Sequence, residues 1–122
     1  MRDTYWRRAR VVRVVDADTL QFVVDLGFYA YAEHRMRLLG VNAPEVHAKD
    51  PDERQRAAAA TAFSTQWLVD HAPHCVDPEW PVSIRTEKAD SFGRFLALLE
   101  CGEGHSLNQE LLDSGHARPY VR

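Results

Sequence analysis

Three short segments of the chain place carboxylates and arginines at the ends of expected strands. They are DADT at 16–19, RLLGVNAPE at 37–45 and DSFGR at 90–94. Carboxylate oxygens bind hard divalent cations, and a guanidinium group matches the geometry of a phosphate. A carboxylate within reach of a water molecule can also act as a general base. If the three segments meet in the fold, these residue types point to chemistry on a phosphate ester.

Strand-forming residues surround these segments. The stretch 11–32 is rich in Val, Phe and Tyr and predicts two strands, with a tight connection at Asp16–Asp18. Alternation of apolar residues continues through the second of these strands as far as Leu26. Residues 34–41 predict a third strand, on which Met36 faces one side and Arg37 the other. Two further strands are expected at 81–87 and 94–100.

Capping residues locate two helices. Asp50 suits the cap and Pro51 the first position of a helix that follows the 42–50 loop. Ser106 with Gln109 has the pattern of a capping box at the start of a second helix, and Gly115 is a suitable end. The first helix has an apolar face that we expect in the core, formed by Ala60, Phe63 and Trp67.

The order of these elements predicts the fold class. Three strands, a helix, two strands and a short helix fit an α+β, five-stranded Greek-key barrel of the OB-fold type. A length of 122 residues predicts one domain, spanning residues 1–122.

Composition and charge restrict the class of protein. A net charge of −3 and a pI of about 6.0 argue against non-specific coating of nucleic acid, although five arginines lie in the first thirteen residues. No apolar run approaches the ~18 residues that span a bilayer, and the N-terminus lacks the apolar segment of a secretory signal. We therefore expect a cytoplasmic protein with no membrane partner, and the oligomeric state is left open.

The three charged segments, in this order, resemble the staphylococcal nuclease (thermonuclease) family. That family has an Asp-Gly-Asp-Thr corner, an Arg-Leu…Asp-x-Pro-Glu run and an Asp-x-Tyr-Gly-Arg turn, and LNQELLDSGHAR at 107–118 is similar to a later family segment. The resemblance runs from about Arg10 to Tyr120. It implies an OB-fold and Ca²⁺-dependent hydrolysis of DNA or RNA, with a preference for single-stranded or locally open substrate.

The resemblance also implies roles for single residues. Arg37 and Arg94 match the two arginines that bind phosphate, and Glu45 matches the glutamate that activates water. The resemblance further implies that the metal is bound by Asp18, Asn42, Glu45 and the carbonyl group of Ala43, with Asp16 in support. The residues expected to bind the substrate are Lys88, Phe92 and Tyr120.

Three of the positions that depart from the family pattern have a clear chemical consequence. Asn42 replaces an aspartate, so we expect weaker Ca²⁺ binding because ligand charge helps to set affinity. Ala17 replaces a glycine and is strained if that position needs a positive φ. Phe92 replaces a tyrosine and lacks its hydroxyl group. The loss of a carboxylate at Asn42 keeps a second reading open, a non-catalytic module of the same fold that binds nucleic acid or protein.

Cysteine and histidine residues outside these segments predict no further site. Cys75 and Cys101 are expected to be reduced thiols, although the sequence does not exclude a disulfide. The HAPHC stretch at 71–75 has zinc-binding residue types, but no second cluster of matching spacing accompanies it. We expect its histidines to be incidental to the function.

Overall fold

A computed structural model describes residues 5–72, 77–88, 94–102 and 104–120. The helices are α1 (Pro51–His71) and α2 (Leu107–Asp113). The strands are β1 (Arg7–Asp16), β2 (Thr19–Gly27), β3 (Ala30–Leu38), β4 (Val41–Asn42), β5 (Val82–Glu87), β6 (Leu96–Cys101), β7 (His105–Ser106) and β8 (Arg118–Pro119).

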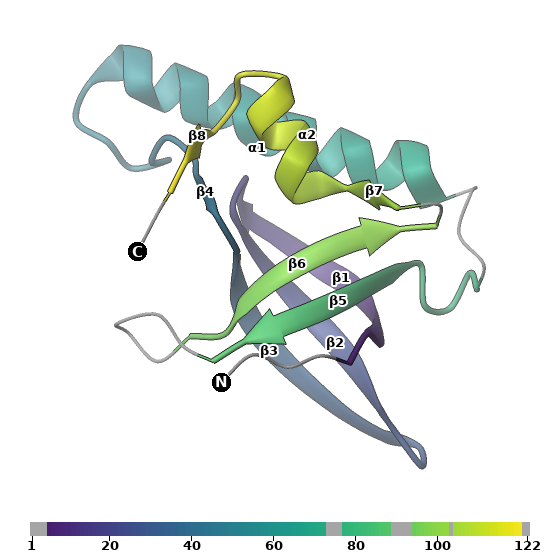
Figure 1. The fold of residues 1–122 in the computed structure, drawn as a ribbon. Coiled ribbons are helices and arrows are strands. Elements are labelled where there is room, and N and C mark those ends of the chain that lie inside the picture. Colours follow the sequence, from purple (N-terminus) through teal and green to yellow (C-terminus); the bar gives the residue numbers. More distant parts are fainter. Residues whose placement is uncertain (1–4, 73–76, 89–93, 103, 121–122) are drawn as a thin grey trace.

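Five of these strands close into a barrel. Antiparallel pairing gives the order β3-β2-β1-β5-β6, and a parallel pairing of β3 with β6 joins the two edges at Arg37 and Leu96. The predicted five-stranded α+β barrel with two helices is therefore confirmed (Figure 1). The prediction of a single domain over residues 1–122 remains a prediction.

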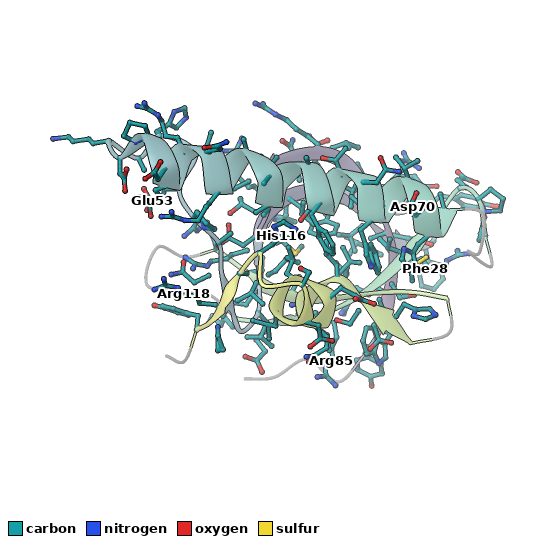
Figure 2. The ribbon with its side chains drawn as sticks, turned by 90° about the horizontal axis from the view of Figure 1, so that it is seen from above. Phe28, Glu53, Asp70, Arg85, His116 and Arg118 are labelled. Atoms are coloured by element: carbon teal, nitrogen blue, oxygen red, sulfur yellow. The ribbon has the colours of Figure 1, made fainter. Side chains whose placement is uncertain are left out.

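The barrel interior follows the period-two pattern of the sequence. Leu20, Phe22 and Val24 on β2 are buried, as are Met36 and Leu38 on β3. Helix α1 runs across the molecule over the barrel, from the end near Glu53 to the end near Asp70 (Figure 2). It packs on the barrel through its buried face, formed by Ala57, Ala60, Ser64 and Trp67. No helix in the described part of the chain is long and apolar enough to cross a membrane.

The helix starts agree with the predicted caps. The side chain of Asp50 accepts a hydrogen bond from Asp52 N–H, with Pro51 at the first helical position. The side chain of Ser106 accepts one from Gln109 N–H. The reciprocal half of the predicted capping box is not formed, because the Gln109 side chain instead donates to Asp113 (2.8 Å).

Two strand predictions need correction. The expected strand at 34–41 is split, since β3 ends at Leu38 and Gly40 has φ +78°, which turns the chain before β4 begins. The apolar alternation of β2 was expected to continue through Leu26, but 51% of Leu26 is exposed. The cause is that the β2–β3 hairpin extends beyond the barrel, so Leu26 lines a cavity beside Val24 and Ala32 instead of packing in the core (Figure 1).

Candidate functional site

The corner between β1 and β2 is tied to two other segments by Asp18. This residue is buried, and its Oδ2 accepts a hydrogen bond from Ala43 N–H (3.0 Å), while Thr19 Oγ1 donates to its Oδ1 (3.3 Å). Its backbone carbonyl accepts from Leu38 N–H (2.7 Å). The corner therefore has a defined position relative to the end of β3 and to the loop after β4.

Arg37 is the centre of a compact polar cluster. It leaves β3 on the outer side of the barrel, and one guanidinium nitrogen donates to Asn42 Oδ1 (2.9 Å) and lies 3.7 Å from Asp18 Oδ2. Its guanidinium also stacks on the Tyr120 ring, 4.9 Å from the centroid. Tyr120 is held there by its backbone N–H, which donates to Gly40 O (2.9 Å). The fold thus brings four of the predicted site residues together.

Two further carboxylates lie near this cluster. Burial raises the pKa of Asp16 above its ordinary value, and the negative charges of Asp18 and Glu45 raise it further, while His47 and Arg35 act in the opposite direction. Glu45 is exposed and follows Ala43 by two residues. The Asp18 corner is therefore a region of concentrated negative charge at the edge of the barrel.

The remaining predicted residues are placed less closely. Arg94 is half-buried and directly precedes Phe95, whose carbonyl oxygen accepts a hydrogen bond from Arg37 N–H (3.1 Å). This puts the backbone of Arg94 beside β3. Lys88 is exposed just after β5, and Phe92 lies outside the described residues.

The possible metal ligands at the site are oxygen atoms, which suit a hard divalent cation, but few of them are charged. Asp18 and Glu45 contribute carboxylates and Ala43 a carbonyl oxygen, whereas the amide oxygen of Asn42 already accepts from Arg37. Among the described residues, no group of three or more His, Cys, Asp and Glu side chains is arranged to hold a metal ion. A cation here would depend on few charged ligands, which lowers the expected affinity.

The alanine at the corner proves to be unstrained. Within the described residues, Phe28 and Tyr29 are the non-glycine positions with positive φ, so Ala17 has an ordinary backbone conformation. Its carbonyl oxygen accepts a hydrogen bond from Ser64 Oγ on α1 (2.9 Å). The strain considered from the sequence is therefore absent, and α1 contributes directly to fixing the corner.

Sequence reasoning missed two buried polar residues that support the site. Ser64 is fully buried and binds the corner as described, and Asn108 on α2 bonds the backbone at Leu39, Ala97 and Leu99 at 2.9–3.0 Å. Both stand on otherwise apolar helix faces. A lone polar residue at a core position of a helix is the signal that would have identified them, because such groups are buried only with hydrogen-bond partners.

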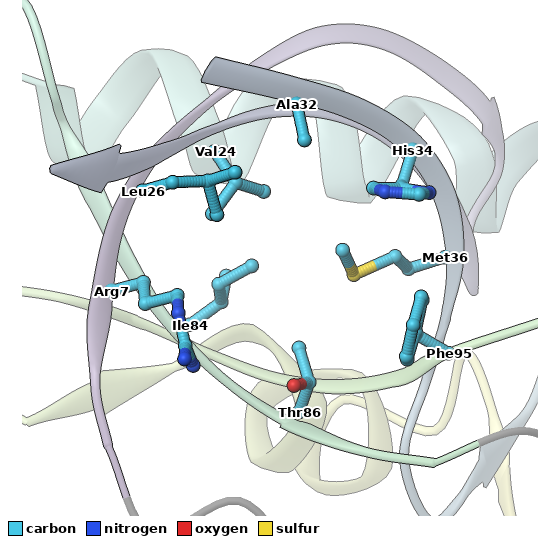
Figure 3. Close-up of a pocket in the computed structure, with 9 residues that line it drawn as sticks. All are labelled: Arg7, Val24, Leu26, Ala32, His34, Met36, Ile84, Thr86 and Phe95. Atoms are coloured by element: carbon cyan, nitrogen blue, oxygen red, sulfur yellow. The ribbon is translucent and has the colours of Figure 1, made fainter. Parts of the chain in front are cut away.

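A separate cavity lies inside the barrel, on the opposite face of β3 from Arg37. It has a volume of about 250 Å³ and an apolar lining that includes Val24, Met36 and Ile84 (Figure 3). Its lining also includes Arg7, His34 and Thr86, and it has none of the predicted site residues.

His71 is the histidine of the HAPHC stretch that lies in the described part of the chain. His71 Nδ1 lies 2.8 Å from Trp67 O, and its ring stacks on Trp67. Cys101 is buried, with its Sγ 3.3 Å from His71 O. His74 and Cys75 lie outside the described residues.

Comparison with known proteins agrees with this architecture. A model of the family described as staphylococcal nuclease homologue matches residues 35–122. An uncharacterized protein of Methanocaldococcus jannaschii is 30% identical over 126 residues, which cover 92% of this chain and 58% of that protein. The chain thus spans little more than half the length of that relative. The matched segment contains most of the cluster around Arg37 and covers more than half of the sequence. The chain therefore belongs to the staphylococcal nuclease homologue family.

Proposed function

We propose that this protein is a metal-dependent nuclease, with Ca²⁺ as the expected ion, that hydrolyses phosphodiester bonds of DNA or RNA. One observation carries the proposal, namely the meeting of Asp18, Arg37, Asn42 and Tyr120 at one point in a chain of this family. A buried carboxylate beside an outward guanidinium can take up a cation and an anionic phosphate side by side.

In this proposal the phosphate binds between Arg37 and Arg94. The guanidinium of Arg37 is held by Asn42 and Tyr120, so little conformational freedom is lost when it binds the phosphate. Two arginines also stabilise the extra negative charge that develops on the phosphoryl oxygens during attack. Lys88, Phe92 and Tyr120 are proposed to contact the nucleotides on either side.

Glu45 is proposed as the general base. It is exposed, so a water molecule can reach it, and it follows the Ala43 carbonyl closely in the chain. Asp18, Asn42, Ala43 and Glu45 would hold the metal ion, with Asp16 in support. When bound, a divalent cation would polarise a phosphoryl oxygen.

The Arg37–Asn42 hydrogen bond favours a second candidate, a non-catalytic module that binds nucleic acid or protein. An aspartate at position 42 offers a charged oxygen to a metal, whereas the amide of Asn42 serves here as an acceptor for Arg37. A chain that has lost this charge can keep the binding surface without the chemistry.

Cleavage of labelled single-stranded DNA with Ca²⁺, with and without chelator, separates the two candidates. We expect chelator-sensitive cleavage that falls by about 10²–10⁴-fold in Glu45→Gln. The exposed Asp70→Asn, near the C-terminal end of α1, is the matched control and should cleave normally. Full metal-dependent activity in Glu45→Gln would refute the assigned base. Binding without cleavage under any divalent ion would support the module.

Calorimetric titration with Ca²⁺ tests the account of Asn42 separately. Asn42→Asp restores a carboxylate and is expected to bind the ion more tightly than wild type. Equal or weaker binding by Asn42→Asp would contradict the idea that Asn42 weakens the site.

A further inference from the structure

The outer face of β1, β2 and β3 carries a row of arginines that begins at the site. Residues paired across neighbouring strands share a face of the sheet, so the strand register identifies them. From the site outward, the pairs on this face are Thr19 with Arg37, Gln21 with Arg13 and Arg35, Val23 with Arg10 and Glu33, and Asp25 with Tyr31.

The positive charge of this face is concentrated in its first part. Arg13 and Arg35 are exposed, and within the described chain neither forms an ion pair. Farther along, Arg8 is neutralised by Asp25 (2.7 Å) and Asp77 (3.1 Å). Carboxylates also face the row, Asp16 near the site and Glu33 midway along it. Arg10, midway along the row, also has no ion pair within the described residues, but its guanidinium lies over Trp80. The described arginines with neither an ion pair nor an aromatic partner on this face are therefore Arg13 and Arg35, the ones nearest to Arg37.

Aromatic side chains stand at the far end of the same face. Tyr31 is half-exposed and stacks on Trp80 with 5.6 Å between ring centroids, and the guanidinium of Arg10 lies 4.8 Å from the Trp80 ring. Beyond them, Phe28 and Tyr29 form the tip of the β2–β3 hairpin and are 102% and 92% exposed. Figure 1 and Figure 2 agree that this tip lies far from the β4–β8 pair beside the site.

The backbone of the hairpin tip has an unfavourable conformation at Phe28 and Tyr29. Phe28 and Tyr29 have φ of 56° and 60°, in the left-handed region that is unfavourable for non-glycine residues. Turns of this type favour Asn-Gly, and neither ring gains burial within this chain. Strained, exposed aromatic residues at a loop tip are typical of a contact with a ligand.

We propose that a single-stranded nucleic acid lies along this face, with phosphates at Arg35 and Arg13 and bases stacked on Tyr31 and on the tip. Bases that are free to stack on aromatic rings occur in single strands, and such stacking does not require a particular sequence. The distance along the strand from Thr19 to Asp25, six residue steps, is about 20 Å at about 3.3 Å per step, which is room for a few nucleotides. The inference rests on the proposed function for its substrate class and extends that site by a second contact region.

The test is fluorescence anisotropy of a labelled single strand of about 12 nucleotides, in chelator so that no cleavage occurs. Arg13→Gln/Arg35→Gln is expected to weaken binding at least tenfold and to lower the salt slope by about 1.4, or about 0.7 per phosphate contact. Phe28→Asn/Tyr29→Gly is expected to weaken binding about 5- to 150-fold, from about 1–3 kcal/mol per stacked base, with the salt slope unchanged.

Arg56→Gln/Arg85→Gln is the matched control, with the same change in charge on α1 and β5, and should bind as wild type does. A strand of about 3 nucleotides, too short to reach the tip, should not distinguish the tip variant from wild type. Wild-type affinity in both test variants, or no binding by wild type, would overturn the inference.

Adding divalent ions to the same samples separates the two proposals. Cleavage by wild type together with unchanged binding in both test variants rejects the second contact region alone. Absence of cleavage together with weakened binding in those variants rejects the nuclease and leaves the binding path intact.

Discussion

The polar side chains at the site end of the barrel are hydrogen-bonded to one another, whereas the aromatic side chains at the tip of the β2–β3 hairpin are exposed to solvent. At the site, Asp18, Arg37 and Asn42 bind one another and nearby backbone groups, so each holds the next in place. At the tip, Phe28 and Tyr29 are exposed in an unfavourable backbone conformation. The first region stabilises the fold and holds the groups of the proposed site in place, whereas the second lowers stability and exposes aromatic side chains to solvent.

The largest expected effect lies behind the site, at Asn108. Asn108→Ala removes three hydrogen bonds and leaves Leu99 N–H and Leu39 O without this partner, while Ala97 O keeps its bond from Leu39 N–H. We expect a loss of about 3–5 kcal/mol in the free energy of unfolding. Urea denaturation measures this. The exposed neighbour provides the control, since Gln109→Ala should cost about 0.5 kcal/mol or less. A loss below about 1 kcal/mol for Asn108→Ala would show that the site end is not held as described.

Substitutions at the hairpin tip should change the free energy of unfolding in the opposite direction, toward higher stability. Phe28→Asn/Tyr29→Gly relieves the left-handed strain and is expected to raise the free energy of unfolding by about 1–2 kcal/mol, measured by thermal or urea denaturation. Phe28→Ala/Tyr29→Ala removes the rings but keeps the strain, so it should change stability little. Destabilisation by the Asn-Gly pair would mean that the rings contribute to the fold, and the contrast between the two regions would fail.

The smallest effect concerns the base of the hairpin and depends on pH. Hydrogen bonds from Gly27 N–H and the Arg8 guanidinium lower the pKa of Asp25 below its ordinary value. The lower pKa in the folded state means that the ionised carboxylate stabilises the fold above the unfolded pKa of about 3.9, and that this stability is lost as pH falls through the folded pKa.

Asp25→Asn should therefore be less stable than wild type at neutral pH, and the two should converge in strong acid. Denaturation midpoints measured across that pH range test this. A difference that persists unchanged in acid would show that the charge of Asp25 does not stabilise the hairpin.

Most of the barrel could be predicted because its signals are local. The alternation at Leu20, Phe22 and Val24 and the caps at Asp50 and Ser106 each depend on neighbours in the chain. The break at Gly40 and the exposure of Leu26 were missed. Both depend on where the barrel ends, and that is set by pairing between distant strands.

The sequence by itself determined the barrel, its helix caps and the residue types of the candidate site, because hydrophobic periodicity, capping and family motifs act within short stretches. Tertiary structure alone decided that Asn42 binds Arg37, that Ser64 and Asn108 support the site, and that Phe28 and Tyr29 stand exposed in a left-handed turn. These features arise from contacts and solvent exposure that depend on how strands and helices far apart in the chain come to lie together.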